Sequence, residues 1–226
     1  MIWIAALLLA SILFTLIYGS FAISSGIYLR SLCRRVGVED KIAITFDDGI
    51  DPQITPKVLA TLSRYGAKAT FFIVGQRAEQ HPQIVEEIVR QGHTIGNHSH
   101  YHRGSFPMQS RAQIASEITQ CNTVLEQITK DKITLFRPPF GVTNPMVGGA
   151  VRDLGLISVG WSIRSLDTLG QPLERVLRRV VGALEGGKVI LLHDNRQGAE
   201  ILLESILIEI EARGLKCVTI NELFNV

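Results

Sequence analysis

Cysteine is scarce in this chain of 226 residues, and neither sign of charge dominates. The three cysteines, Cys33, Cys121 and Cys217, include no pair at Cys-x-x-Cys spacing, which argues against a disulfide scaffold and against a zinc site built from thiolates. We expect Cys121 and Cys217 to be small buried residues. The formal net charge is only +2, and no basic run is interleaved with aromatic residues, so nucleic acid is not an expected partner.

Charged side chains are also absent between Ile2 and Leu29. A helix of about 20 apolar residues is long enough to cross a bilayer, so we predict a transmembrane anchor or signal-anchor over residues 1–29. The positively charged start of a cleaved signal peptide is missing. Arg30, Arg34 and Arg35 follow the segment, and basic residues tend to stay on the cytoplasmic side. The orientation of the chain in the membrane is therefore left open.

The rest of the chain, after a polar linker over residues 30–40, alternates between strand and helix patterns. Short apolar runs such as 42–46 and 189–192 predict buried strands, and longer stretches such as 110–128 predict amphipathic helices. This alternation implies a parallel sheet that is covered on both faces. We predict an α/β domain over residues 41–226 that forms a distorted (β/α) barrel of about seven parallel strands.

Five clusters of polar and aromatic residues follow the predicted strands. Because the carboxyl ends of parallel strands meet at one edge of a sheet, these clusters are expected to share one site. Together they supply carboxylates, imidazoles and a guanidinium, which suits a metal-dependent hydrolytic site. The clusters are Thr45–Gly49, His98–His102, Arg137–Gly141, Trp161–Asp167 and Leu191–His193.

The first two clusters contain the candidate metal ligands. Asp47 and Asp48 are adjacent at the end of a strand, so one can bind a metal while the other faces a water; the alternative is an ordinary Asp-Asp-Gly turn. His98 and His102 have a spacing that lets both rings converge on one ion, and His100 is an alternative partner for His98. The remaining histidines outside the predicted site are expected to be structural: His81 and His93.

Three further residues are candidates for proton transfer and its support. Arg137 precedes two prolines that fix the backbone, and a rigid arginine suits a buried carboxylate, for which Asp167 is the predicted partner; the alternative is a surface arginine before a turn. His193 ends a buried strand, where a general acid can reach the site. Asp194 can be a helix or turn cap instead of a participant.

The clusters resemble the motifs of the NodB-type polysaccharide deacetylases of carbohydrate esterase family 4. The first motif, Thr-Phe-Asp-Asp-Gly, is matched at Thr45–Gly49, and the second, His-Ser-x-x-His, at His98–His102. The third, Arg-x-x-x-Gly, is matched at Arg137–Gly141, and the fifth, Leu-x-His, at Leu191–His193. The resemblance spans Lys41 to Ile220 and so covers nearly all of the globular part.

The resemblance implies catalytic roles for the matched residues. Asp47 would be the general base, oriented by Arg137, and His193 would be the general acid that protonates the leaving amine. The backbone N–H of Phe140 would help to hold the oxyanion. Asp167, in the fourth cluster, would support the catalytic set through Arg137.

The resemblance also implies that Asp48, His98 and His102 bind the metal, so His100 drops out as a ligand. Zinc is the expected ion, with cobalt, nickel or manganese as alternatives, because mixed histidine and carboxylate sites accept several ions. The expected substrate-binding residues are Phe140, Leu191 as a wall of the acyl pocket, and Trp161.

The substrate groove departs from the family pattern at three positions. The fourth motif usually ends Asp-Trp, but Thr168 follows Asp167 here, so an aromatic residue is missing. Arg164 stands where an acidic residue is common, and Ile50 replaces a proline that often follows the first motif. The type of reaction is therefore better supported than the substrate.

The resemblance implies a metal-dependent hydrolase that removes N-acetyl groups from polysaccharide containing N-acetylglucosamine, either peptidoglycan or a chitin-like glycan. The expected location is the bacterial plasma membrane, with one membrane pass and an extracytoplasmic catalytic domain. No protein partner can be inferred. One alternative is a deformylase or deacylase of a lipid-linked amino sugar. Another is a non-catalytic carbohydrate-binding membrane protein, which the retention of Asp47 disfavours.

Overall fold

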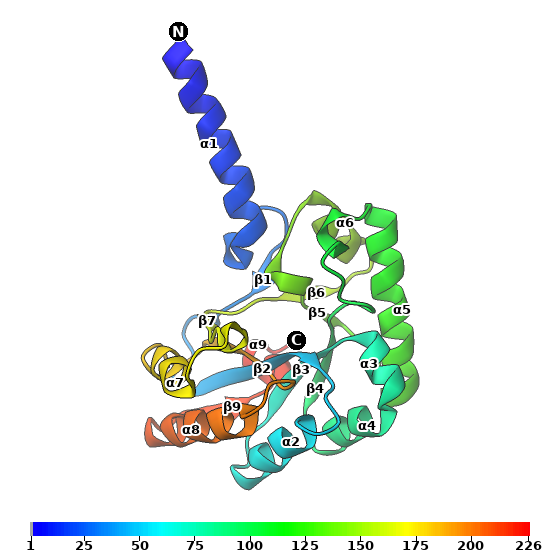
Figure 1. Ribbon diagram of the computed structural model, residues 1–226, viewed down its shortest axis with the longest axis vertical. Coiled ribbons are helices and arrows are strands. Elements are labelled where there is room, and N and C mark those ends of the chain that lie inside the picture. The colour runs from blue at the N-terminus through cyan, green and yellow to red at the C-terminus, as the bar shows by residue number, and fades with distance from the viewer. Residues whose placement is uncertain (1) are drawn as a thin grey trace.

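The computed structural model describes residues 2–226, and its described strands form one curved sheet (Figure 1). The sheet has nine strands in the order β1-β6-β5-β4-β3-β2-β8-β7, and β9 pairs with β2 beside this path. Each of these pairings is parallel. The strands are β1 (Ser31–Leu32), β2 (Lys41–Gly49), β3 (Ala69–Ile73), β4 (Thr94–Asn97), β5 (Leu135–Phe136), β6 (Ile157–Val159), β7 (Ile163–Arg164), β8 (Val189–His193) and β9 (Lys216–Val218).

The helices after α1 surround the sheet, while α1 projects away from it (Figure 1). Short 3-10 turns η1 (Ile23–Ser25), η2 (Phe106–Met108), η3 (Pro139–Gly141) and η4 (Asp167–Leu169) lie between the larger elements. The helices are α1 (Ile2–Phe21), α2 (Thr55–Arg64), α3 (Gly75–Gln80), α4 (Pro82–Arg90), α5 (Arg111–Thr129), α6 (Pro145–Asp153), α7 (Leu173–Val181), α8 (Ala199–Ala212) and α9 (Ile220–Phe224).

The predicted α/β class and parallel sheet are confirmed, but the number of strands and the closure of the barrel differ from the prediction. Within residues 2–226 the sheet begins at β1 and ends at β7, and these two strands do not pair, so the barrel stays open. The sequence predicts about seven strands and the structure has nine, mainly because β1 and β7 have only two residues each and are too short to predict. Strands this short carry no alternating or continuous apolar pattern that a sequence can show.

Strand β2 is the centre of the sheet, with β3, β8 and β9 hydrogen-bonded to it. Ile42, Ala43 and Ile44 are fully buried, as expected for a parallel strand that is covered on both faces. The strand ends with Asp47 and Asp48, so the core strand delivers two carboxylates to the carboxyl edge of the sheet.

The predicted burial of two cysteines and the structural place of His93 also agree with the structure. Cys121 and Cys217 are buried and free, and burial raises the pKa of the Cys217 thiol to about 12. His93 is buried at the opposite end of β4 from the second motif, and its Nδ1 accepts a hydrogen bond from the backbone N–H of Ala69 at 3.2 Å. None of these groups lines the cavity described below.

The N-terminal segment differs from the expected transmembrane anchor. No helix formed by the described residues has both the length and the apolar character that a membrane crossing requires. The predicted anchor over residues 1–29 is therefore not supported. Helix α1 ends at Phe21, and the chain then folds back against the domain, where Ile23 and Leu29 are buried.

The stretch expected to be a polar linker, residues 30–40, contributes to the sheet. Ser31 and Leu32 form β1, which pairs with Ser158 and Val159 of β6. Farther along, Arg35 donates a hydrogen bond from Nη1 to the carbonyl oxygen of Phe224 at 2.7 Å. These contacts attach the stretch to the rest of the domain at strand β6 and at helix α9.

Candidate active site

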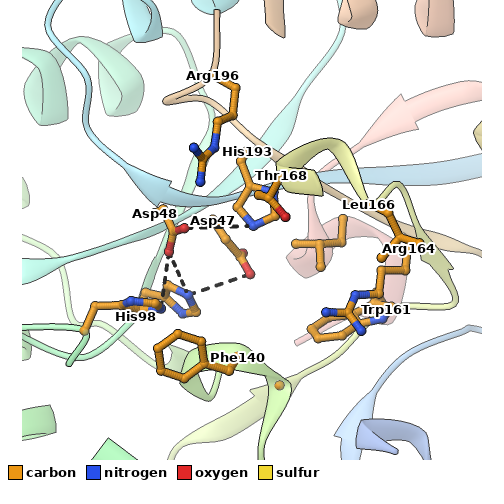
Figure 2. A pocket seen from close by; sticks show the side chains of 13 residues that line it. Asp47, Asp48, His98, Phe140, Trp161, Arg164, Leu166, Thr168, His193 and Arg196 are labelled. Atoms are coloured by element: carbon orange, nitrogen blue, oxygen red, sulfur yellow. Dashed lines mark ion pairs between the residues drawn. The ribbon is translucent and has the colours of Figure 1, made fainter. Parts of the chain in front are cut away.

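Strands β2 and β4 bring together three ligand candidates, Asp48, His98 and His102, which we call the metal cluster. One ligand atom from each lies within 4.8 Å of the others. Asp48 Oδ1 is 3.5 Å from His98 Nε2 and 3.3 Å from His102 Nε2, and Figure 2 shows Asp48 and His98 pointing towards each other. His100, the alternative ligand, is buried apart from the cluster, with its Nε2 3.8 Å from a carboxylate oxygen of Glu79.

The metal cluster is held in an unusual backbone conformation. Asp48, Ser99 and His102 all have positive φ, at 64°, 63° and 52°, which costs energy in residues with a side chain and is concentrated at functional sites. Hydrogen bonds hold these turns: Asn97 Oδ1 accepts from the Ser99 N–H at 2.7 Å, and Ser99 Oγ accepts from the His102 N–H at 3.0 Å. Arg77 donates to the carbonyl oxygen of Asp48.

The protonation states suit metal binding. His98 Nδ1 is 2.9 Å from the carbonyl oxygen of Arg137, which can only accept, so Nδ1 carries the hydrogen and Nε2 is free for a ligand. Burial, with the nearby charge of His98, lowers the pKa of His102 to about 4. Burial alone would raise the pKa of Asp48, but hydrogen bonding and the charges of the surrounding imidazoles hold it well below its usual range. Two imidazole nitrogens and one ionised carboxylate form a donor set that fits a zinc-like ion.

Arg137 is fully buried and forms an ion pair with Asp47, which is 4% exposed. Its Nη1 donates to Asp47 Oδ1 at 2.6 Å, and the other carboxylate oxygen of Asp47 lies 3.8 Å from His98 Nε2. Burial lowers the pKa of Arg137, and the charge of Asp47 opposes this shift. The remaining acceptors of the guanidinium are Thr45 Oγ1 at 2.8 Å, the Val159 carbonyl at 3.1 Å and the Gly160 carbonyl at 2.8 Å.

The predicted pair between Arg137 and Asp167 is wrong. Asp167 instead contacts His193: its Oδ1 is 2.8 Å from His193 Nδ1, and its Oδ2 accepts the His193 backbone N–H at 2.9 Å. The reason lies in the backbone, because Leu166 has a φ of 59° and turns Asp167 towards the end of β8. Arg137 pairs with Asp47, the residue that the family resemblance implies it orients.

The contact with Asp167 fixes the orientation of His193. With Nδ1 facing the carboxylate, the ring directs Nε2 towards the metal cluster, where it is 4.0 Å from Asp48 Oδ2. Burial would lower the pKa of His193, but the hydrogen bond and charge of Asp167, with the charges of Asp47 and Asp48, raise it above its ordinary value. An imidazole that holds its proton beside the site can act as a general acid.

A cavity of about 240 Å³ opens over these groups, and the predicted substrate-binding residues Phe140, Leu191 and Trp161 line it. The Phe140 ring is 4.6 Å from the His102 ring. Phe140 has a φ of 60°, and within residues 2–226 no acceptor is paired with its backbone N–H. Gly141 is required beside it, because a Cβ at that position would collide with the Trp161 ring. Trp161 thus supplies an aromatic wall although the Asp-Trp pair of the fourth motif is missing.

Sequence reasoning missed some residues at this site. Leu166, Thr168 and Arg196 line the cavity, and so does Arg164, which we had noted only as a departure from the family pattern. Arg196 follows His193 by three residues, and this closeness to a motif is the only signal in the sequence.

Asp194 follows His193 and is fully buried. Its Oδ2 accepts a hydrogen bond from Thr55 Oγ1 at 2.7 Å, and burial raises its pKa to about 7. Gly49 must lack a side chain here, because a Cβ would lie 2.7 Å from Asp194 Oδ1. Asp194 therefore joins the loop after β8 to the end of β2 and the start of α2, and none of the helices between residues 2 and 226 has it as a cap.

Comparisons with known proteins agree with this site. The polysaccharide deacetylase family matches residues 35–159. A peptidoglycan-N-acetylglucosamine deacetylase of Bacillus cereus is 36% identical over 190 residues, which are 82% of this chain and 88% of that protein. The corresponding enzyme PgdA of Listeria monocytogenes is 32% identical over 184 residues, which are 81% of this chain but only 39% of that protein.

A solved structure shows the same fold. Peptidoglycan deacetylase PdaC from Bacillus subtilis superposes with a TM-score of 0.77 at 27% identity, over 83% of this chain and 91% of that one. The residues that the family matches, 35–159, include the strands that carry the first three motifs and the cavity residues beside them. The chain therefore belongs to the polysaccharide deacetylase family, and the resemblance to NodB-type enzymes of carbohydrate esterase family 4 is confirmed.

Proposed function

We propose that this protein is a metal-dependent hydrolase that removes N-acetyl groups from the N-acetylglucosamine residues of peptidoglycan. One observation carries the proposal: the metal cluster lines a single cavity together with Asp47, which is paired with Arg137, and His193, which is paired with Asp167. The B. cereus and L. monocytogenes relatives act on this glycan by name, which supports peptidoglycan as the substrate.

The chemistry begins with activation of a water molecule. Asp48, His98 and His102 would hold a divalent ion, which would supply polarisation of the acetyl carbonyl and would lower the pKa of a water molecule from about 15.7 towards 7. Asp47 takes the proton from the attacking water, and the hydrogen bond from Arg137 holds its carboxylate in place beside the cluster. The free N–H of Phe140 donates to the oxyanion that forms, and the loss of one such donor typically costs about a hundredfold or more in rate.

The second half of the reaction needs an acid. His193 gives the proton on Nε2 to the leaving nitrogen as the amide C–N bond breaks, and Asp167 stabilises the charged ring through Nδ1. The water oxygen stays on the carbonyl carbon, so the products are acetate and an amino sugar with a free amine. Leu191 and Trp161 flank the space that the acetyl group would occupy.

Zinc is the proposed ion, because two imidazoles and one carboxylate are a common zinc-binding set and leave positions open for water and substrate. Cobalt, nickel and manganese remain alternatives for the same donors. Metal analysis of the purified protein, followed by reconstitution of the metal-free form with each ion, tests the choice.

The proposed place of action is outside the cytoplasm at the bacterial plasma membrane, because that is where a peptidoglycan substrate lies. Attachment through residues 1–29 is supported only by their uncharged sequence. Cell fractionation combined with protease accessibility tests both parts. A protease-protected cytoplasmic protein would contradict the location.

The function is tested by acetate release from peptidoglycan and from N-acetylglucosamine oligomers, with and without a chelator. We expect release that stops with chelator and returns with zinc. Asp47→Asn should retain zinc and lose turnover, whereas His98→Ala should lose zinc affinity. His81→Ala, outside the metal cluster, is the matched control and should keep both. Full activity of Asp47→Asn would refute the assignment of the base.

A further inference from the structure

Two arginines at the cavity have no acidic partner. Arg164 lies in β7 and Arg196 in the loop after β8, and both are exposed and line the cavity. Neither guanidinium forms an ion pair with any carboxylate in residues 2–226, although Arg164 lies 5.6 Å from the centroid of the Trp161 ring. Elsewhere on the surface some arginines are paired, namely Arg34 with Glu185, Arg64 with Glu204, Arg90 with Glu87 and Arg111 with Asp153, and others such as Arg175 and Arg178 have no carboxylate partner among the described residues. Arg164 and Arg196 differ from these in that both line the cavity.

The two guanidinium groups lie on different sides of the reacting centre. Figure 2 shows Arg196 on the side of Asp48 and Arg164 beside Trp161, with His193 and Thr168 between them. They therefore do not form one pocket for a single anion. Arg164 and Arg196 thus provide two separate cationic positions in the lining of the cavity.

We propose that Arg164 and Arg196 select a glycan whose reacting amino sugar has a carboxylate-bearing neighbour on each side. The inference rests on the proposed function and names the substrate class of that site. A guanidinium presents a planar pair of N–H donors that matches a carboxylate, and an unpaired one attracts it over several ångströms. In peptidoglycan every second sugar is a muramic acid, so each N-acetylglucosamine inside a strand has two such neighbours. A neutral homopolymer would leave both arginines unpaired.

The carboxylate has two possible sources on a muramic acid residue. It is the lactyl group itself where the peptide has been removed, and it belongs to the peptide where the peptide is present. Both offer the same chemistry to an arginine. Because both arginines are exposed, each ion pair is expected to contribute only about fivefold in affinity and to weaken as salt is added.

Binding to the Asp47→Asn chain, measured by calorimetry, tests the proposal without turnover. The probes are soluble peptidoglycan strands, the same strands after amidase treatment to remove the peptides, and an N-acetylglucosamine tetramer. We expect Arg164→Gln and Arg196→Gln each to lower the ratio of strand affinity to tetramer affinity about fivefold, and the double variant about twentyfold. Arg175→Gln, an exposed arginine on α7 away from the cavity, is the matched control and should keep the ratio.

The arms of this experiment separate the possibilities. A lowered ratio that persists on amidase-treated strands supports the lactyl carboxylate, and one that disappears there supports the peptide carboxylates. An unchanged ratio, or an effect of only one arginine, as a single phosphate or carboxylate would give, overturns the proposal. If the wild-type chain releases no acetate but the ratio still depends on both arginines, the proposed function fails and the selectivity stands.

Discussion

At the scale of single residues, the active site depends most on Arg137, which is fully buried and has an ordered acceptor for each of its three nitrogens. Arg137→Met would leave the Asp47 carboxylate buried without its partner. Removing one member of a buried ion pair typically costs about 3–5 kcal/mol, so we expect a loss of that size in the free energy of unfolding. Urea unfolding of the metal-free protein measures it. Arg175→Met, an exposed control, should change it by less than about 0.5 kcal/mol.

A loss below about 1 kcal/mol in Arg137→Met would show that Asp47 finds water or another donor in the absence of the guanidinium. Arg137→Lys is informative beside it. Lysine restores the positive charge but not the planar fork that reaches several acceptors at once, so its stability should lie between those of the wild type and the methionine variant.

Asp167 is expected to control the pH dependence of the reaction. Its hydrogen bond and charge are among the causes that raise the pKa of His193 above its ordinary value, so that the ring stays protonated at higher pH. In Asp167→Asn the pKa of His193 should fall, and the alkaline limb of the rate profile should move to lower pH. A pH profile of acetate release measures the shift. Asp153→Asn, at an exposed ion pair on α6, is the control. An unmoved limb would mean that another group donates the proton.

Asp194 is expected to weaken the fold as the pH rises. Its pKa is about 7 in the folded protein and 3.8 in the reference state, so the folded protein holds this proton more tightly. Stability from this group is complete below about pH 4 and is lost as the pH rises through 7. The stability of Asp194→Asn minus that of the wild type should therefore grow across this range, by an amount on the order of a few kcal/mol.

Urea unfolding of both metal-free proteins between pH 4 and pH 8 gives this difference. Other titrating groups, such as His93 and His102, have lowered pKa values and shift stability in the opposite direction. Because they are present in both chains, they cancel in the difference. A difference that stays constant with pH would show that Asp194 is ionised in the folded protein.

At the scale of elements, Asn97 connects helix α5 to the loop that carries two metal ligands. Its Nδ2 donates to the Ile118 carbonyl at 2.8 Å and to Asn122 Oδ1 at 2.7 Å, while its Oδ1 holds the Ser99 N–H. We expect Asn97→Ala to lower zinc affinity at least tenfold, because groups that orient ligands typically contribute 10–100-fold. Competition with a chromophoric chelator measures the affinity.

Asn144→Ala is the matched control for this experiment. Asn144 caps α6 through two backbone N–H groups, at 2.9 Å each, so its loss also destabilises a helix without touching the metal cluster. Zinc affinity should be unchanged in this variant. Equal losses in both variants would mean that Asn97 acts only through global stability.

The elements also show how much of the fold the sequence predicts. Helix α5 was predicted within one residue at each end, because its apolar period is long and Ser110 and Gln113 form a capping box at its start. Helix α3 was missed, because six residues with hardly any apolar side chains give no period to recognise. Patterns therefore identify long elements, while short ones are decided by tertiary contacts.

The same limit applies to the site. The convergence of Asp48, His98 and His102 could be predicted, because each follows a strand of one parallel sheet. The partner of Asp167 could not, since it depends on the positive φ of Leu166 in a short turn. The position of Arg196 could not be predicted either, because it depends on the path of a loop that has no motif of its own.

At the scale of the whole molecule, residues 22–37 are expected to be part of the folding unit. Ile23 and Leu29 are buried, and β1 extends the sheet beside β6. A chain that begins at residue 38 loses these contacts, and burial of each such side chain contributes about 1.5–3 kcal/mol. We therefore expect it to be less stable by about 3 kcal/mol or more than a chain that begins at residue 15. Urea unfolding of the two chains gives the comparison, and equal stabilities would contradict the expectation.

The end of α1 is bound to the loop that follows the third motif. Thr143 donates its N–H to the Ser20 carbonyl at 2.9 Å and its hydroxyl to the Gly19 carbonyl at 2.7 Å, two residues after Gly141 beneath Trp161. These two hydrogen bonds join the end of the helix directly to the loop that forms part of the cavity wall. The axis of α1 and the direction in which the cavity opens therefore have a fixed relation. Any contact that orients this helix in the cell also orients the opening of the cavity relative to its substrate.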